Sequence, residues 1–98
     1  MVTTAKKQID FSQQAYAALY SLSPKEHDKA MKLIELSGNN LHGLLSEEKS
    51  YKLGIFDRNI YALKLNEKLR IIVEIMDDKI EILDVLNRDL HDIYFKKQ

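Results

Sequence analysis

Cysteine is absent from this chain of 98 residues, and histidine is scarce. Without cysteine the chain can form neither a disulfide framework nor a thiolate metal site, and a reducing compartment is compatible with it. Its three histidines, His27, His42 and His91, are widely separated in the sequence. We therefore predict no metal site and no cofactor.

Long apolar runs are absent as well. The first residues, MVTTAKKQIDF, lack the apolar segment of a secretory signal, and no stretch reaches the roughly 20 residues of a membrane span. We therefore expect a cytoplasmic protein that makes no use of a membrane. Hydrophobic residues make up 45% of the chain and charged residues 31%, which is typical of a folded domain, and the length predicts a single domain covering residues 1–98.

An excess of charge of one sign is the third absence. Fifteen basic and fifteen acidic residues cancel, so no global field attracts the protein to nucleic acid. The charges do separate locally: residues 49–70 carry six basic residues against two acidic ones, and residues 74–84 carry one against five. Most such runs are solvated faces. Any binding of nucleic acid must therefore depend on particular local cations.

Two helices are predicted after a short strand at residues 9–11. Ser12 is a suitable N-cap for the first helix, over AYAALYSL. The second begins at Ser23-Pro24-Lys25-Glu26, which has serine at the cap, proline at the first helical position and glutamate in a capping box. It should end near residues 37–40, where Gly38 can take a left-handed conformation. The inward-facing residues are predicted to be Ala15, Leu19, Leu22, Ala30, Met31, Leu33 and Ile34.

Strand patterns dominate the second half of the chain. Residues 41–57 indicate a loop with a possible strand at 51–56, and then NIYALKL, LRIIVEIM and KIEILDVL follow with only short turns between them. Short turns make successive strands antiparallel neighbours. We predict an α+β fold, with two N-terminal antiparallel helices packed on one face of a small twisted antiparallel sheet. A short helix or turn should follow at the C-terminal end.

The first turn of this meander decides where two cations lie. If Asn66-Glu67-Lys68 forms the hairpin loop, Lys64 lies directly opposite Arg70, on the face away from the helices. Opposed like charges destabilise a sheet by up to about 1 kcal/mol. The pair therefore either binds an anion or extends into water. The loop has no glycine, which leaves this register open.

The stretch VLNRDLHDIY, residues 85–94, adds further polar groups after the last strand. Arg88, His91 and Tyr94 are spaced three residues apart. Arg88 can project from the strand end, and Tyr94 from the following turn or helix, towards the pair described above. Taken singly, Tyr94 would be explained by core packing and His91 by simple exposure.

Together these segments resemble a known family. Two helices followed by YALKL, NEKLRIIVEI and VLNRDLHDIY resemble the RelE/ParE superfamily of type II toxin–antitoxin toxins, and the spacing from Arg88 to Tyr94 is similar to that of the RelE branch. The resemblance implies the RelE-like microbial RNase fold. It also implies a ribosome-dependent messenger RNA endonuclease that needs no metal, is inhibited by a cognate antitoxin, and uses the 2′-hydroxyl of the RNA to attack the adjacent phosphate.

The resemblance further implies a role for each matched residue. Lys64 helps to activate the hydroxyl, and Arg70 stabilises the charge of the phosphorane. Arg88 assists the leaving group or holds a second phosphate, and Tyr94 stacks on the nucleotide or orients it. These roles are physically sensible, because phosphoryl chemistry depends on cations placed where charge develops.

The chain also departs from the family. Ala62 stands where the RelE branch has a second lysine, so that Lys68 and Lys52 become candidates for substrate binding and for that missing cation. Some relatives use a histidine near the C-terminus as general acid, a role that His91 matches poorly in position. Two alternatives stay open: a ParE-like DNA gyrase poison, which needs no joint action of the four matched residues, and an inactive relative that acts only by binding protein.

Overall fold

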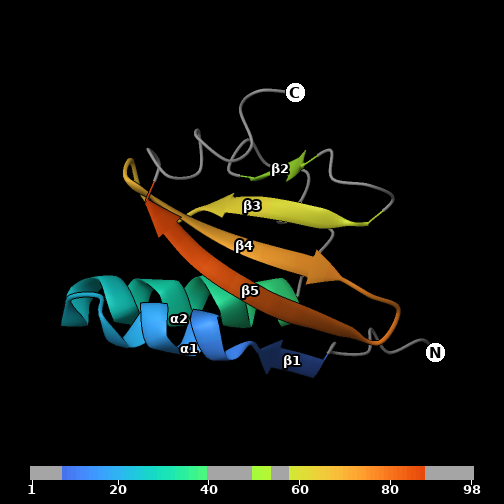
Figure 1. Cartoon of the computed structure of the whole chain (residues 1–98), viewed down its shortest axis with the longest axis horizontal. Helices are drawn as coiled ribbons and strands as arrows, with labels where there is room; N and C mark the ends of the chain where they lie inside the picture. The colour runs from blue at the N-terminus through green and yellow to red at the C-terminus, as the bar shows by residue number, and fades with distance from the viewer. Residues whose placement is uncertain (1–7, 40–49, 54–57, 88–98) are drawn as a thin grey trace.

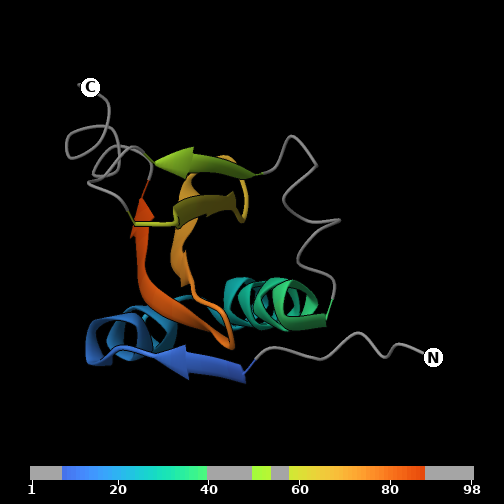
Figure 2. The same ribbon diagram turned by 90° about the vertical axis from the view of Figure 1, so that its right-hand side faces the viewer.

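The computed structural model describes residues 8–39, 50–53 and 58–87. The elements, in chain order, are β1 (Gln8–Phe11), α1 (Gln13–Tyr20), α2 (Pro24–Asn39), β2 (Ser50–Leu53), β3 (Ile60–Lys64), β4 (Leu69–Ile75) and β5 (Lys79–Asn87). The strands form one five-stranded sheet in the order β1-β5-β4-β3-β2. Figures 1 and 2 show both helices beside the β1–β5 part of the sheet and far from β2. The predicted α+β class, with two N-terminal helices, is confirmed.

The sheet is mixed rather than purely antiparallel. The pairs β2–β3, β3–β4 and β4–β5 are antiparallel, as the short turns predict. β1 instead lies parallel to β5 at the edge, with Ile9 opposite Ile80. The pattern of a four-residue strand does not specify its partner, and the expectation of an antiparallel sheet was wrong for this pair.

Ser12 connects the first helix to the last strand. Its side-chain oxygen accepts a hydrogen bond from the backbone N–H of Ala15 at 3.0 Å, which confirms the predicted N-cap. The same hydroxyl donates to the carbonyl oxygen of Leu83 at 2.8 Å, and the backbone N–H of Ser12 donates to the carbonyl of Ile82 at 3.0 Å. The start of α1 is therefore fixed against β5.

β5 contains a β-bulge at this contact. Ile72 of β4 pairs with Asp84, whereas the next residue, Val73, pairs with Ile82, so Leu83 is the extra residue. The bulge changes which residues of β5 face the helices. Ile80, Ile82 and Val85 are buried on the helix side, and Leu83 and Leu86 pack on the other side.

The second helix begins as predicted and reaches the region predicted for its end. The backbone N–H of Glu26 donates to the Ser23 side-chain oxygen at 3.2 Å, and the Ser23 hydroxyl donates to a Glu26 carboxylate oxygen at 3.2 Å. α2 then continues through Gly38 to Asn39. The hydroxyl of Ser37, which is fully buried, donates to the carbonyl of Ile34 at 2.6 Å, so this polar residue is satisfied inside the helix. The described helix therefore reaches Asn39, within the region 37–40 predicted for its end, but Gly38 lies inside it rather than after its last residue.

The core confirms most of the predicted inward-facing residues. Ala15, Leu19, Ala30 and Ile34 are buried against the sheet, and Leu22 and Leu33 are partly buried there. Met31 is 37% exposed, so its predicted inward position is wrong. Residue 31 lies about 100° around the helix from Ala30, outside the buried stripe.

Both faces of the meander carry buried residues. The helix side contains Leu63, Ile71 and Val73, with Leu69 and Ile75 partly buried, which confirms the predicted alternation of β4. The opposite face contains a smaller cluster of Ile60, Ala62 and Ile72. On β3 and β4 this cluster therefore lies between Glu74 at one end of the face and Lys64 with Arg70 at the other.

Several expectations concern other parts of the chain. β2 confirms the first part of the strand expected at 51–56, and residues 54–57 lie outside the described residues. The helix or turn expected after the last strand lies in residues 88–98, also outside them. In the parts that the structure describes, no helix combines the length and the apolar character needed to cross a membrane.

Candidate phosphate-binding site

The β3–β4 hairpin places two cations opposite each other. Lys64 pairs with Arg70, which confirms the register that the sequence left open. Asn66 shapes the turn in place of a glycine, because its side-chain oxygen accepts hydrogen bonds from the backbone N–H groups of Lys68 at 2.8 Å and Leu69 at 2.9 Å. The turn therefore fixes the positions from which both cations extend.

Arg70 is a buried arginine with unused hydrogen-bonding capacity. The residue is only 7% exposed, and Nη1 donates to the carbonyl oxygens of Asn66 at 2.8 Å and Leu69 at 3.1 Å. Its Nε is buried and has no hydrogen-bond partner in the described structure. Buried polar groups are almost always satisfied. The two Nη1 hydrogen bonds hold the guanidinium in place, and a cation positioned in this way is suited to receive an anion.

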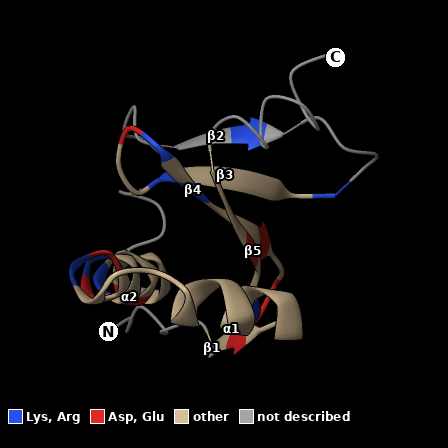
Figure 3. Ribbon diagram, turned by 60° about the vertical axis from the view of Figure 1, so that its left-hand side comes forward, with Lys and Arg blue, Asp and Glu red and all other residues tan. Residues whose placement is uncertain are grey.

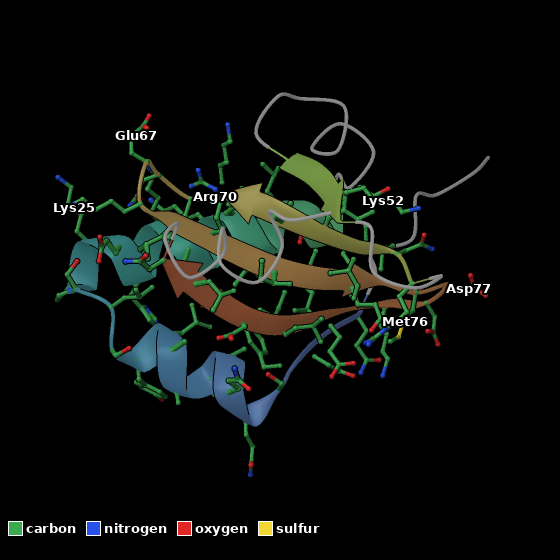
Figure 4. All side chains as sticks on the ribbon, turned by 45° about the horizontal axis from the view of Figure 1, so that its top comes forward. Lys25, Lys52, Glu67, Arg70, Met76 and Asp77 are labelled. Atoms are coloured by element: carbon green, nitrogen blue, oxygen red, sulfur yellow. The ribbon has the colours of Figure 1, made fainter. Side chains whose placement is uncertain are left out.

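A cavity of about 470 Å³ opens at this hairpin. Its lining residues are Lys29, Lys64, Leu65, Asn66, Glu67 and Arg70. Three cations from α2, β3 and β4 thus meet one carboxylate. Figure 3 shows basic residues in blue and an acidic residue in red at the end of the β3–β4 hairpin, on the same side of the molecule as α2. Figure 4 shows Glu67 and Arg70 together at this end.

The other predicted lysines do not line the cavity. Lys52 pairs with Tyr61, which packs against the core on the helix side, so Lys52 lies on the opposite face from Arg70. Figure 4 also shows these two residues well separated along the sheet. Lys68 is exposed in the hairpin loop. Arg88, His91 and Tyr94 lie outside the described residues, and their roles stay predictions.

Lys29 is the lining residue that the sequence analysis missed. It belongs to a set of exposed lysines on α2, at positions 25, 29 and 32. Charged residues on the outer side of a helix usually indicate only solvation. Nothing in their spacing reveals that the β3–β4 hairpin turns towards residue 29. This contact follows from the tertiary packing of α2 against the sheet.

A second cavity has a different character. It measures about 220 Å³ and lies between α1 and α2. Its lining residues are Phe11, Tyr16, Leu19, Tyr20, His27 and Met31. Tyr16 stacks on Phe11 with ring centroids 5.6 Å apart and on Tyr20 at 6.0 Å. The described residues that line this cavity include neither lysine nor arginine, so they do not suit a phosphate. Nor do the described residues place three potential metal ligands together anywhere.

The pocket cations differ from the arginine at the other end of the same face. Arg58 binds Glu74 in a two-pronged ion pair, with Nε 3.0 Å from one carboxylate oxygen and Nη2 2.5 Å from the other. Within residues 8–39, 50–53 and 58–87 the ion pairs are Arg58–Glu74 and Lys79–Asp10. Neither pair includes a cation of the pocket, so these cations are available to an external anion.

Replacing Glu74 with glutamine is expected to reduce the acid sensitivity of the fold. The hydrogen bonds from Arg58 lower the pKa of Glu74 from its ordinary value of 4.5. The ionised carboxylate therefore stabilises the folded state above that value, and this contribution is lost as the pH falls through the lowered folded pKa. The contribution should stay below about 1 kcal/mol, because Arg58 is half exposed.

The measurement is the free energy of unfolding in urea from neutral pH down to about pH 3, a range that spans the carboxylate pKa values. The wild type should lose stability more steeply below pH 5 than Glu74→Gln. The matched control is Arg58→Gln, which should reproduce the shallower curve by removing the other partner. Identical slopes in all three proteins would contradict this prediction.

The mixed sheet and its two helices have the fold of the RelE, YoeB and YafQ toxins. No protein-family model and no curated protein sequence matches the chain. Solved structures do match it over most of its length. The RelE/ParE-type fold implied by the sequence resemblance is therefore confirmed.

Three solved structures illustrate the match. RelE of Pyrococcus horikoshii, solved with RelB, is 22% identical with a TM-score of 0.70, covering 85% of this chain and 96% of that one. YoeB of Staphylococcus aureus, solved as a dimer, is 25% identical with a TM-score of 0.67, covering 82% and 94%. YafQ of E. coli, in the DinJ–YafQ toxin–antitoxin complex, is 18% identical with a TM-score of 0.71, covering 87% and 96%.

Proposed function

We propose that this protein is the toxin of a type II toxin–antitoxin system and acts in the cytoplasm as a ribosome-dependent messenger RNA endonuclease. The observation that carries the proposal is the state of Arg70. This arginine is buried opposite Lys64, two backbone carbonyls hold its guanidinium, and it lines a cavity of a fold shared with RelE, YoeB and YafQ. A site of this kind supplies fixed positive charge to a phosphate.

The proposed reaction is an internal transesterification of RNA. The 2′-oxygen forms a bond to the adjacent phosphorus while the bond from phosphorus to the 5′-oxygen breaks, which leaves a 2′,3′-cyclic phosphate and a 5′-hydroxyl. The 2′-hydroxyl loses its proton and the departing 5′-oxygen gains one. Lys64 is assigned to the attacking hydroxyl and Arg70 to the phosphorane oxygens, where negative charge develops.

Arg88 and Tyr94 complete the proposed site. Arg88 is assigned to the leaving group or a second phosphate, and Tyr94 to stacking on the nucleotide, since an aromatic face can hold an unstacked base. In this scheme the side chains supply the positive charge themselves, and neither a metal ion nor a small-molecule cofactor takes part.

The proposed partners are a cognate antitoxin, the ribosome and messenger RNA. RelE was solved with RelB, and YafQ with DinJ in a toxin–antitoxin complex. The chain has no net charge, so its attraction to RNA must come from clustered cations such as those of the hairpin pocket. An antitoxin that covers this pocket would block the site without any change in the fold.

Mapping the 5′ ends of a messenger RNA in a cell-free bacterial translation reaction tests the proposal. The purified protein is added with ribosomes present or omitted. We expect cuts only with ribosomes, within the codon in the A site, and we expect the Arg88→Ala variant to lose them while it still binds antitoxin. Intact messenger under both conditions, with the protein shown to be folded, would favour a gyrase poison or an inactive relative.

A further inference from the structure

The cavity at the hairpin has more room and more charge than one phosphate needs. Its volume of about 470 Å³ is that of a small-ligand cleft, which typically measures about 300–1,000 Å³. Lys29, Lys64 and Arg70 face it together with one carboxylate, that of Glu67. A single phosphodiester carries one negative charge. It would leave part of the positive charge of this cavity uncompensated.

The cations come from two sides of the cavity. Lys64 and Arg70 are opposed across the β3–β4 ladder and form one wall. Lys29 reaches the cavity from α2, next to Ala30, which is fully buried under the sheet and fixes this turn of the helix. Lys29 is exposed, and it belongs to neither of the ion pairs of the described residues. Its ammonium group is therefore available to a ligand held by the opposite wall.

We infer that Lys29 binds the phosphate adjacent to the scissile one, so that the pocket holds two consecutive phosphates of a single RNA strand. The inference rests on the proposed function, because Arg70 and Lys64 must hold the scissile phosphate. Lysine suits the second position, since its ammonium is a mobile point charge that tolerates variation in phosphate direction, whereas arginine grips oxygens in a fixed fork. Lys29 is thus a binding residue, and it does not touch the reacting atoms.

The inference predicts that the effect of Lys29 depends on the number of phosphates in the ligand. Two probes are a trinucleotide with two phosphodiesters and a dinucleotide with one, each with 2′-deoxy sugars at the cleavable positions. Binding is followed by NMR titration of the isotope-labelled protein. Lys29→Ala should weaken trinucleotide binding roughly threefold to tenfold and lower the salt dependence of log K by about 0.7. Dinucleotide binding should not change.

Two further variants distinguish a direct contact between Lys29 and a phosphate from a general effect of positive charge on α2. Lys32 lies about one turn along α2 from Lys29 and does not line the cavity. The Lys32→Ala variant removes the same charge and should bind both probes as the wild type does. Lys29→Arg keeps the charge and should retain trinucleotide binding. The wild type and Lys29→Ala should bind with equal affinity to a trinucleotide in which a neutral methylphosphonate replaces the second phosphate.

Three results would overturn the inference. The first is wild-type binding of the trinucleotide that is no tighter than that of the dinucleotide, the second is an unchanged Lys29→Ala variant, and the third is an equal loss in Lys32→Ala. The proposed function fails separately, when ribosome-dependent cleavage is absent from the wild type. Cleavage that persists in the wild type while Lys29→Ala binds normally would reject the two-phosphate pocket alone.

Discussion

Replacing Arg70 with alanine is expected to lower the rate of ribosome-dependent RNA cleavage about 10²–10³-fold, the loss typical of removing one group that stabilises transition-state charge. The guanidinium is held in place before substrate arrives, by the carbonyls of Asn66 and Leu69. Arg70 also lines the hairpin cavity, so a phosphate bound there meets a guanidinium that is already in position. The measurement is the cleavage rate of a defined messenger in a translation reaction, under single-turnover conditions.

A matched control for this variant lies on the same face of the sheet. Arg58 is also an arginine, but Glu74 occupies its guanidinium, so Arg58→Ala should cleave within about twofold of the wild type. Because Arg70 is buried, far-UV circular dichroism and antitoxin binding must show that Arg70→Ala still folds. Arg70→Lys keeps the positive charge but lacks the planar guanidinium that donates two hydrogen bonds, so it should recover only part of the cleavage rate. Wild-type cleavage by a folded Arg70→Ala would refute the catalytic assignment.

Replacing Ile71 with alanine is expected to destabilise the fold by about 2–5 kcal/mol, the usual cost of this truncation in a core. Ile71 is fully buried on the helix side of β4 and belongs to the larger cluster. Small domains have only about 5–15 kcal/mol of net stability. The loss should therefore appear as a large shift of the urea unfolding midpoint.

Two substitutions calibrate that result. Ile71→Val removes one methyl group and should cost about 0.5–1.5 kcal/mol. Leu36→Ala changes a residue of α2 that is 46% exposed and should stay within about 0.5 kcal/mol of the wild type. An Ile71→Ala variant as stable as Leu36→Ala would show that this cluster does not hold the domain together.

The sequence predicted the parts of the structure that depend on local pattern. The two-residue period of β4 placed Ile71 and Val73 on the helix side, and the three-residue loop placed Lys64 opposite Arg70. The absence of glycine from that loop left the register open. The side chain of Asn66 resolves it, because an asparagine can replace a backbone group in a turn.

Features that depend on distant contacts could not be predicted in the same way. The parallel pairing of β1 with β5 and the position of Lys29 at the cavity join segments far apart in the chain, and the bulge at Leu83 lies where Ser12 contacts β5. The prediction that Met31 faces inward was wrong for a related reason. Helical periodicity indicates which side of a helix is apolar, but it does not show where the buried part of that side ends. In the site, charge and strand register identified Lys64 and Arg70, whereas the burial of Arg70 required the packed structure.

The contact of Ser12 with Leu83 also has a consequence for how the chain is made. These residues are 71 positions apart, and β1 and α1 both rely on β5 for their packing. At synthesis rates of about 5–20 residues per second, Leu83 is synthesised roughly 4 to 14 seconds after Ser12. During that interval the nascent helix has no sheet to cover its apolar side. Chaperones and proteases therefore have their best access to this protein before the fifth strand exists.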